Sequence, residues 1–232
     1  MKNHSSIKPT VAVLVAGAAL LTSCASNEPT MSRPAVQDSQ VTVGAYGTDP
    51  QQLVLAEVYA GSFQRSGREG VTLTGLASGE RISAVRSGEA TMAFGCTGEL
   101  LGLLDPARAR ELAEEYARDD DPDKELSPEW RDTTYAAFSE SLPGSMMATD
   151  PSNAQGCDDV NKANPGASLP QHVVPFYSVP ALTRRDRVDA LNRVAGSLTT
   201  KEVAQMTKDV VNGGEPATIA EEWLATSKFA TG

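Results

Sequence analysis

The sequence predicts an α/β protein with a mostly parallel sheet flanked by helices. Short β-branched or apolar runs end at glycine or turn signatures, and the segments between them carry apolar residues at helical spacing. Between residues 41 and 95 the expected order is strand, helix, strand, helix, strand, with connections short enough for right-handed crossovers. Three more helical segments close the chain. We therefore expect parallel strands covered by helices.

In the first half of the chain, turn and capping residues mark where each element begins and ends. The expected elements are a strand at 41–46, a helix from Pro50 to Gly67, a strand at 71–74, a helix at 80–87 and a strand at 91–95. Asp49 or Thr48 can cap the first helix, with Pro50 at its first position. Gly88 is expected to stop the helix that precedes it.

The second half of the chain reads as mostly helical, with one long turn-rich segment. Helices are expected at 100–104, 107–118, 130–140, 184–195, 200–211 and 217–226, with a strand at 145–149 and an extended run at 172–177. The proline of that run, Pro175, suits an edge strand or a crossing segment. Thr199 and Glu202 form a capping box. Residues 150–170 have few large apolar side chains and contain the turn signature Asn164-Pro165-Gly166.

The N-terminus has the pattern of a bacterial lipoprotein leader. Lys2 and Lys8 precede an apolar run from Val11 to Leu21 that is too short to span a bilayer, and Leu21-Thr22-Ser23-Cys24 forms a lipobox. We expect residues 1–23 to be a signal peptide, Cys24 to be the lipidated residue and residues 24–40 to be a flexible tether to the domain at 41–232. The alternative is an ordinary secretory signal with a chance cysteine.

The charge of the chain is strongly acidic. The whole sequence has a formal net charge of −10, and removing the leader with Lys2 and Lys8 leaves 18 basic against 30 acidic residues, or −12. Such a surface argues against a nucleic-acid partner and against electrostatic docking on anionic lipid. It suits an exported protein attached to the extracytoplasmic face of the membrane by its lipid alone.

Cysteine and histidine usage restricts the chemistry. With Cys24 assigned to lipid, Cys96 and Cys157 remain as an even pair in an oxidising compartment, either bridged or as two buried thiols. The chain has two histidines, His4 in the leader and His172, and no metal-ligand spacing. We expect no catalytic constellation, no metal and no cofactor, and a binding function in place of an enzymatic one.

Four stretches carry a resemblance to a known family. They are the opening strand and helix at 41–59, the segment 81–90 that ends in Ser87-Gly88-Glu89, the turn at 94–100, and a tail from Val174 through Leu191 and Leu198 to Leu224. In order and spacing they resemble the substrate-binding lipoproteins of ABC importers for glycine betaine, choline and related osmoprotectants. The resemblance implies a periplasmic-binding-protein-like fold of type II.

The departures from the family pattern are informative. Family members have two lobes, whereas the middle of this chain is reduced to loop 150–170, which is too short to build a second core. We therefore expect a single lobe. Cys96 also stands where the family turn has an aromatic residue.

The resemblance implies a permease partner in the membrane and a small quaternary-ammonium or zwitterionic solute. Such ligands are held by aromatic faces, and open α/β sheets bind ligands at the carboxyl ends of their strands. The candidate ligand-binding residues are Tyr46, Thr48, Asp49, Thr97 and Tyr177.

Two functions remain open at this point. The first is a solute-binding lipoprotein of an ABC transporter, which predicts aromatic and acidic side chains at one open rim. The second is a single-lobe lipoprotein of the cell envelope that has lost ligand closure and serves as an interaction or regulatory protein. It predicts a filled cleft with loop 150–170 packed across it.

Overall fold

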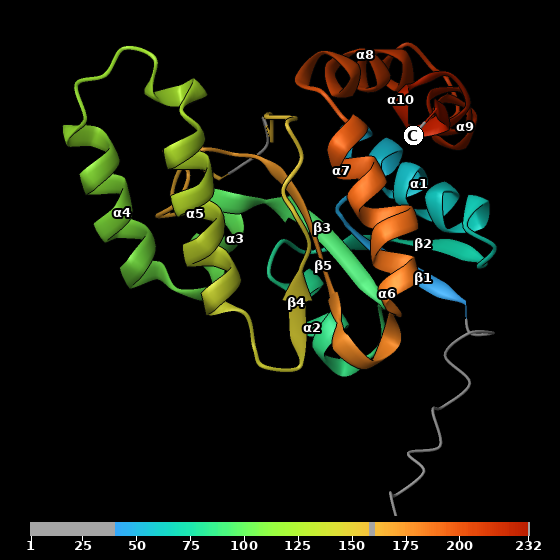
Figure 1. The fold of residues 1–232 in the computed structure, drawn as a ribbon, viewed down its shortest axis with the longest axis horizontal. Helices are drawn as coiled ribbons and strands as arrows, with labels where there is room; N and C mark the ends of the chain where they lie inside the picture. Colours follow the sequence, from blue (N-terminus) through green and yellow to red (C-terminus); the bar gives the residue numbers. More distant parts are fainter. Residues whose placement is uncertain (1–39, 158–160, 232) are drawn as a thin grey trace, which may run out of the picture. The chain divides into compact units, whose positions relative to one another are not determined.

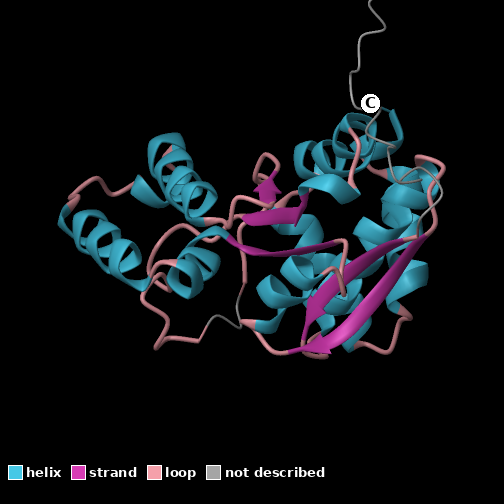
Figure 2. Cartoon of the chain, turned by 90° about the horizontal axis from the view of Figure 1, so that it is seen from below, coloured by secondary structure: helices cyan, strands magenta, loops and turns pink. Residues whose placement is uncertain are grey.

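The computed structural model describes residues 40–157 and 161–231, and they build one five-stranded sheet with helices on both faces (Figures 1 and 2). The first half of the fold alternates strands and helices as expected. It consists of β1 (Val41–Tyr46), α1 (Pro50–Arg65), β2 (Gly70–Leu76), α2 (Glu80–Ser87) and β3 (Met92–Cys96). Asp49 caps α1 by accepting a hydrogen bond from the Gln51 backbone N–H, and Gly88 ends α2 with a φ of 83°.

The middle of the chain forms a helical block and then the edge of the sheet. Its elements are α3 (Thr97–Leu104), α4 (Pro106–Arg118), the short 3₁₀ turn η1 (Lys124–Leu126), α5 (Pro128–Ser141) and β4 (Met146–Ala148). In Figure 1, α4 and α5 lie side by side away from the centre of the sheet. Tyr116 of α4 and Trp130 of α5 make an edge-to-face contact at 5.1 Å between ring centroids.

The last part of the chain returns to the sheet and then covers it. It contains β5 (Val173–Ser178), the 3₁₀ turn η2 (Val179–Ala181), α6 (Arg184–Asp186), the π-helical turn η3 (Arg187–Asn192), α7 (Arg193–Ser197), α8 (Thr200–Val211), α9 (Pro216–Thr226) and α10 (Lys228–Thr231). The capping box of Thr199 and Glu202 is present at the start of α8. The expected helix at 184–195 is a continuous helical run made of α6, η3 and α7.

The sheet is mixed, with the order β2-β1-β3-β5-β4. The α/β class is confirmed, but only β2, β1 and β3 are mutually parallel, because β5 pairs antiparallel with both β3 and β4. The expectation of an edge position for 172–177 is wrong, since β5 lies inside the sheet. The Pro175 carbonyl accepts a hydrogen bond from the Thr149 N–H just beyond the last residue of β4, so the proline's missing donor faces the end of that short strand.

Alternate residues of each strand build two hydrophobic layers. On the first face, side chains such as Val43, Phe94 and Val173 pack with α1, α8 and α9. On the second face, side chains such as Ala93 and Phe176 pack with α2, α3 and α5. Within the described residues, the stretch from 149 to 172 has no helix or strand and one isolated bridge, between Gln155 and His172, but Ala154, Cys157 and Leu169 pack into the two layers.

Candidate functional site

Three of the predicted ligand residues lie together where β1 meets α1. Tyr46 ends the strand, Thr48 is exposed in the turn, and Asp49 is the α1 cap. Asp49 also lies on the wall of a cavity of about 570 Å³ between the start of α1 and α8. The three residues therefore stand at the carboxyl end of β1, but the cap bond from Gln51 already uses one Asp49 oxygen.

A buried arginine occupies the carboxyl-end edge of the sheet beside Tyr46. The Arg81 side chain is fully buried, and its Nη2 atom lies 2.6 Å from the Glu99 carboxylate. Its Nη1 atom donates to the Phe94 carbonyl oxygen at 2.8 Å, and Ser78 donates to the same Glu99 oxygen at 2.6 Å. The guanidinium carbon lies 5.3 Å from the centre of the Tyr46 ring. A cation of the protein itself therefore contacts the Tyr46 ring.

Thr97 lies at the same edge but is fully buried. Its hydroxyl donates to the Pro170 carbonyl at 2.8 Å and accepts from the His172 N–H at 3.2 Å. These two bonds use its hydroxyl hydrogen and hold the strand start of β5 against α3. The Thr97 hydroxyl therefore has no free hydrogen to donate to a ligand, as its predicted ligand role would need.

The turn-rich segment at 161–171 packs tightly on α3. A Cβ atom on Gly98 would lie 2.5 Å from the Gln171 Nε2 atom, and one on Gly102 would collide with the Asn164 side chain. Only glycine permits this approach of backbone to helix. Asn164 also donates to the Glu99 carbonyl at 3.0 Å. The start of α3 is therefore covered by this segment.

The two cysteines of the domain are joined. Cys96, at the end of β3, forms a disulfide with Cys157, and their Cα atoms are 6.2 Å apart. The neighbouring Gly156 carbonyl accepts a hydrogen bond from Gln51 Nε2 at 2.7 Å. The bridge expected between these cysteines is thus present, and it fixes the loop after β4 to the carboxyl-end edge.

Tyr177 lies far along the sheet from the other predicted ligand residues. Because β5 runs antiparallel, Tyr177 pairs with Met92 at the start of β3, whereas Cys96 at the end of β3 pairs with Val173. The structure therefore does not bring the five predicted residues into one cluster. Tyr177 belongs instead to an open pocket on the first face of the sheet, beyond the part that α1 covers.

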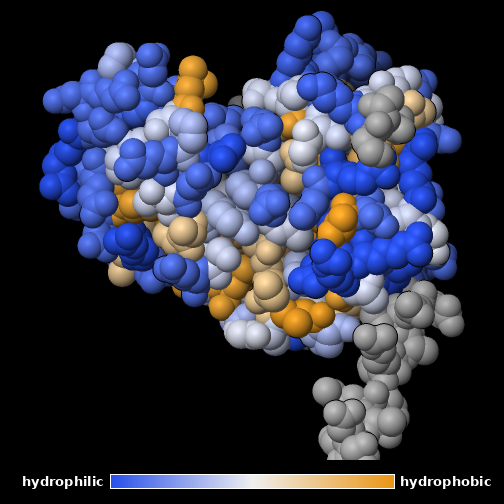
Figure 3. Space-filling model, in the orientation of Figure 1, coloured by the Kyte–Doolittle hydropathy of each residue, from blue (hydrophilic) through white to orange (hydrophobic). Residues whose placement is uncertain are grey.

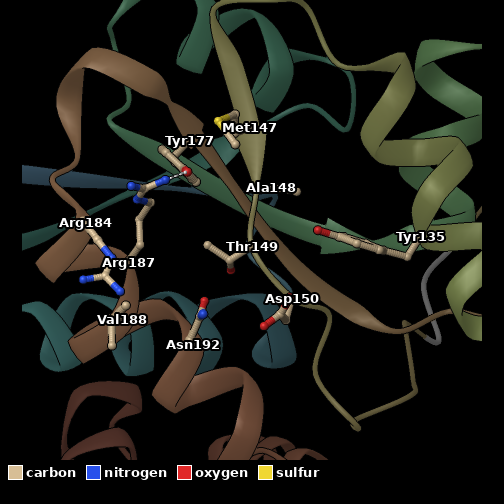
Figure 4. A pocket seen from close by; sticks show the side chains of 10 residues that line it. All are labelled: Tyr135, Met147, Ala148, Thr149, Asp150, Tyr177, Arg184, Arg187, Val188 and Asn192. Carbon is tan, nitrogen blue, oxygen red and sulfur yellow. Dashed lines mark hydrogen bonds between the residues drawn. The ribbon is translucent and has the colours of Figure 1, made fainter.

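This pocket has a volume of about 270 Å³ and is built from four parts of the fold, one of which is Tyr177 of β5 (Figure 4). Tyr135 comes from α5, Met147 to Asp150 come from β4 and the residues after it, and Arg184 to Asn192 come from α6 and η3. Asp150, which follows β4, faces Arg184 and Arg187 on the helical wall across the pocket. We call it the Tyr135 pocket.

Electrostatics in the Tyr135 pocket favour a neutral tyrosine beside a carboxylate. Burial, and then the nearby charge of Asp150, raise the pKa of the Tyr135 hydroxyl above its ordinary value. Across the pocket, Arg187 donates from Nη1 to the Tyr177 hydroxyl at 3.1 Å, and its guanidinium carbon is 5.9 Å from the Tyr177 ring centre. Tyr135 thus keeps its hydroxyl proton as a donor at neutral pH.

Apolar side chains border the pocket on the surface. Met147 is 45% exposed and Val188 is 46% exposed, and both line it. Figure 3 shows apolar surface gathered over the region of β4, between helical blocks that are mostly hydrophilic. Small-molecule sites usually combine apolar lining with a few placed polar groups, and the polar groups are unusually numerous in this pocket.

Other kinds of site are not found in the part of the chain that the structure describes. No group of three or more His, Cys, Asp or Glu side chains there could hold a metal ion. None of the helices within residues 40–157 and 161–231 has the length and apolar character needed to cross a membrane. Residues 1–39, which include the expected leader and Cys24, lie outside the described residues, so lipidation of Cys24 stays a prediction.

Sequence reasoning missed most residues of the Tyr135 pocket. Tyr135 reads as one more helical residue, and Arg187 and Asn192 read as parts of a closing helix. Tyr177 is the lining residue that was predicted, and among the others Asp150 carried a usable signal, because it directly follows the strand expected at 145–149 and therefore stands at a carboxyl end.

Comparison with known proteins identifies the fold. No family model and no curated protein sequence matches the chain. A crystal structure described as a glycine betaine/carnitine/choline ABC transporter aligns with a TM-score of 0.55 at 10% identity, over 79% of this chain and 97% of that one. Apo YehZ from Escherichia coli aligns with a TM-score of 0.54 at 12% identity, over 80% of this chain and 98% of that one.

At this identity the likeness establishes the fold. The chain shares the α/β fold of these two solved structures, as the resemblance implied.

Proposed function

We propose that the protein is an extracytoplasmic solute-binding lipoprotein of an ABC transporter that imports osmoprotectants of the glycine betaine and choline kind. The fold is that of such binding proteins, and the lipobox supplies the anchor at Cys24 on the outer face of the membrane. The partner is then a permease in the membrane, and the protein itself performs no chemistry.

One observation carries this proposal: the Tyr135 pocket presents an aromatic hydroxyl, a carboxylate and an arginine at a single opening. The exposed Asp150 can attract a cationic group beside the Tyr135 ring. Arg187 stands on the opposite wall and can attract a carboxylate. An open rim with aromatic and acidic side chains is what the solute-binding function predicts, and the positions of Tyr135 and Asp150 support it.

The carboxyl-end edge, where the sequence placed the site, contributes less to this proposal. Arg81 already contacts the Tyr46 ring, and the Thr97 hydroxyl makes both of its hydrogen bonds with backbone atoms. Tyr177 is the predicted residue that lines the Tyr135 pocket, and we assign it to the solute site together with Asp150 and Tyr135.

Calorimetric titration of the purified full-length protein tests the proposal. We expect saturable binding, with a Kd below about 100 µM (near −5.5 kcal/mol), for at least one of glycine betaine, choline, carnitine and proline. Asp150→Asn should weaken it at least fivefold, whereas Asp132→Asn, on the exposed side of α5, should not. A folded protein that gives no heat with any of the four up to millimolar concentration contradicts solute binding.

The anchor is tested separately. Cells that express the protein and are fed a labelled fatty acid should incorporate the label, and Cys24→Ala should abolish incorporation. Labelling that persists in the variant contradicts the anchor at Cys24, whatever the titration gives.

A second function is favoured by the filled edge of the sheet. Arg81, Glu99 and the segment 161–171 occupy the place where an open α/β sheet would bind its ligand, and the disulfide fixes the neighbouring loop. This arrangement suits a single-lobe envelope lipoprotein that acts through protein contacts. It predicts that the protein co-purifies with a membrane partner equally well with and without solute.

A further inference from the structure

The Tyr135 pocket contains buried polar atoms that have no partner in the protein. They are Thr149 Oγ1, Arg187 Nε and Asn192 Oδ1. Thr149 is the most enclosed of the three residues, with 8% of its surface exposed. Native proteins pair almost all such atoms with protein, water or ligand. Figure 4 shows all three side chains around the same opening.

The unpartnered atoms divide into two chemical kinds. Arg187 Nε can only donate a hydrogen bond, and the Thr149 hydroxyl can donate as well as accept. Asn192 Oδ1 can only accept, and so can the carboxylate of Asp150, which lies on the same wall as Thr149. A ligand that satisfies them must bring both acceptor oxygens and hydrogen-bond donors.

The aromatic content of the pocket is too small for a cage around a methylated ammonium. Tyr177 is 1% exposed, and its ring and hydroxyl are both engaged by Arg187. Among the described residues that line the pocket, Tyr135 therefore presents the one aromatic group not already covered by a cation. A quaternary ammonium carries no N–H and would leave Asn192 Oδ1 unpaired.

We propose that the pocket selects a small amino zwitterion that keeps N–H hydrogens, in preference to a fully N-methylated one. Its carboxylate lies against Arg187 and Thr149, and its protonated amine donates to Asn192 Oδ1 and Asp150. The inference rests on the proposed function for solute capture in this pocket, and it replaces the fully N-methylated solutes named there by small zwitterions that keep N–H hydrogens. A primary or secondary α-amino acid of about the size of proline fits a cavity of about 270 Å³.

The experiment compares ligands that differ in N-methylation alone. The full-length protein is titrated calorimetrically with proline and N,N-dimethylproline, and with glycine, N-methylglycine, N,N-dimethylglycine and glycine betaine. We expect proline to bind at least tenfold more tightly than its dimethyl derivative, and affinity to fall along the glycine series as N–H hydrogens are lost.

Variants assign the preference to the acceptor on η3. Asn192→Leu should reduce proline affinity at least tenfold and leave N,N-dimethylproline within threefold of its original affinity. Asn192→Asp keeps an acceptor at the same place and should retain the preference. Asn212→Leu, at the exposed end of α8, is the matched control and should change neither affinity. Circular dichroism of each variant verifies folding.

The outcomes separate the two proposals. If the methylated members bind as tightly as the N–H-bearing ones or more tightly, the inference is overturned while solute binding stands. If none of the six ligands binds to a folded protein, the inference is overturned, and the solute-binding function falls with it when choline and carnitine also give no heat. A preference for proline that survives Asn192→Leu also overturns the assignment, because the selecting acceptor would then lie elsewhere.

Discussion

The carboxyl-end edge of the sheet and the Tyr135 pocket contain the same kinds of side chain in opposite states. At the edge, Arg81 is fully enclosed and paired with Glu99, a backbone carbonyl and the Tyr46 ring. In the pocket, Arg187 and Thr149 keep buried atoms without partners. Arginine, carboxylate and tyrosine side chains thus stabilise the fold at the edge, whereas in the pocket they are available to a ligand. The two regions differ in whether the buried hydrogen-bonding atoms already have partners in the protein.

The largest expected effect comes from breaking the ion pair at the edge. Glu99→Ala leaves the Arg81 guanidinium buried without its carboxylate, and we expect a loss of about 3–5 kcal/mol of unfolding free energy. Urea denaturation of the purified protein measures it. Glu111→Ala, which removes the partner of the exposed Arg108, should have little effect. Equal losses in the two variants would show that the enclosed pair is no more important than a surface pair.

The disulfide is expected to contribute nearly as much. It joins residues 61 positions apart, and the loop-entropy model assigns about 4 kcal/mol to a closure of that length. We expect the paired substitution Cys96→Ala with Cys157→Ala to lower the urea midpoint, and a reducing agent to lower that of the original protein to a similar value. A midpoint unaffected by reducing agent would contradict the stabilising role of the bridge.

Thr97, whose hydroxyl is hydrogen-bonded, and Thr149, whose hydroxyl has no partner, allow the most direct comparison of the two regions. Thr97→Val removes a hydroxyl that bonds Pro170 and His172, so it should destabilise the protein by about 1–3 kcal/mol. Thr149→Val removes a buried hydroxyl without a partner and should be neutral, or stabilising by up to about 1 kcal/mol. Denaturation curves of both variants measure the difference. The same sign and size for both would remove the distinction between the two regions.

The smallest expected effect is a pH dependence at His172, which links the loop after β4 to β5. Burial lowers the pKa of its imidazole, opposed by its hydrogen bond to the Ser152 carbonyl and modulated by the charges of Arg131 and Asp132. The unfolded chain therefore takes up a proton near pH 6.5 while the folded chain stays neutral. Stability should be fully present above that pH and should decline as the pH falls through it toward the lower folded pKa.

His172→Gln isolates this contribution, because both proteins contain the same carboxylates. Urea midpoints measured between pH 5 and pH 8 should fall more steeply with acid in the original protein than in the variant. Parallel curves would mean that His172 binds its proton equally well in the folded and unfolded chains.

The sequence by itself determined the local structure of this protein. Apolar periodicity, the Asp49 cap, the stop at Gly88 and the capping box at Thr199 placed the elements, because each depends on residues within a few positions of one another. An even pair of cysteines in an oxidising compartment also indicated the pairing of Cys96 and Cys157. The order of the four family-like stretches indicated the fold.

Only the tertiary structure decided where the functional groups meet. Periodicity shows which face of a strand is buried but not which strand lies beside it, so the interior antiparallel position of β5 could not be inferred. That position separates Tyr177 from Tyr46. The Tyr135 pocket likewise joins side chains from α5, β4 and η3, and Arg81 finds Glu99 across a sheet edge. Such contacts depend on how whole elements pack, and no short stretch of sequence contains that information.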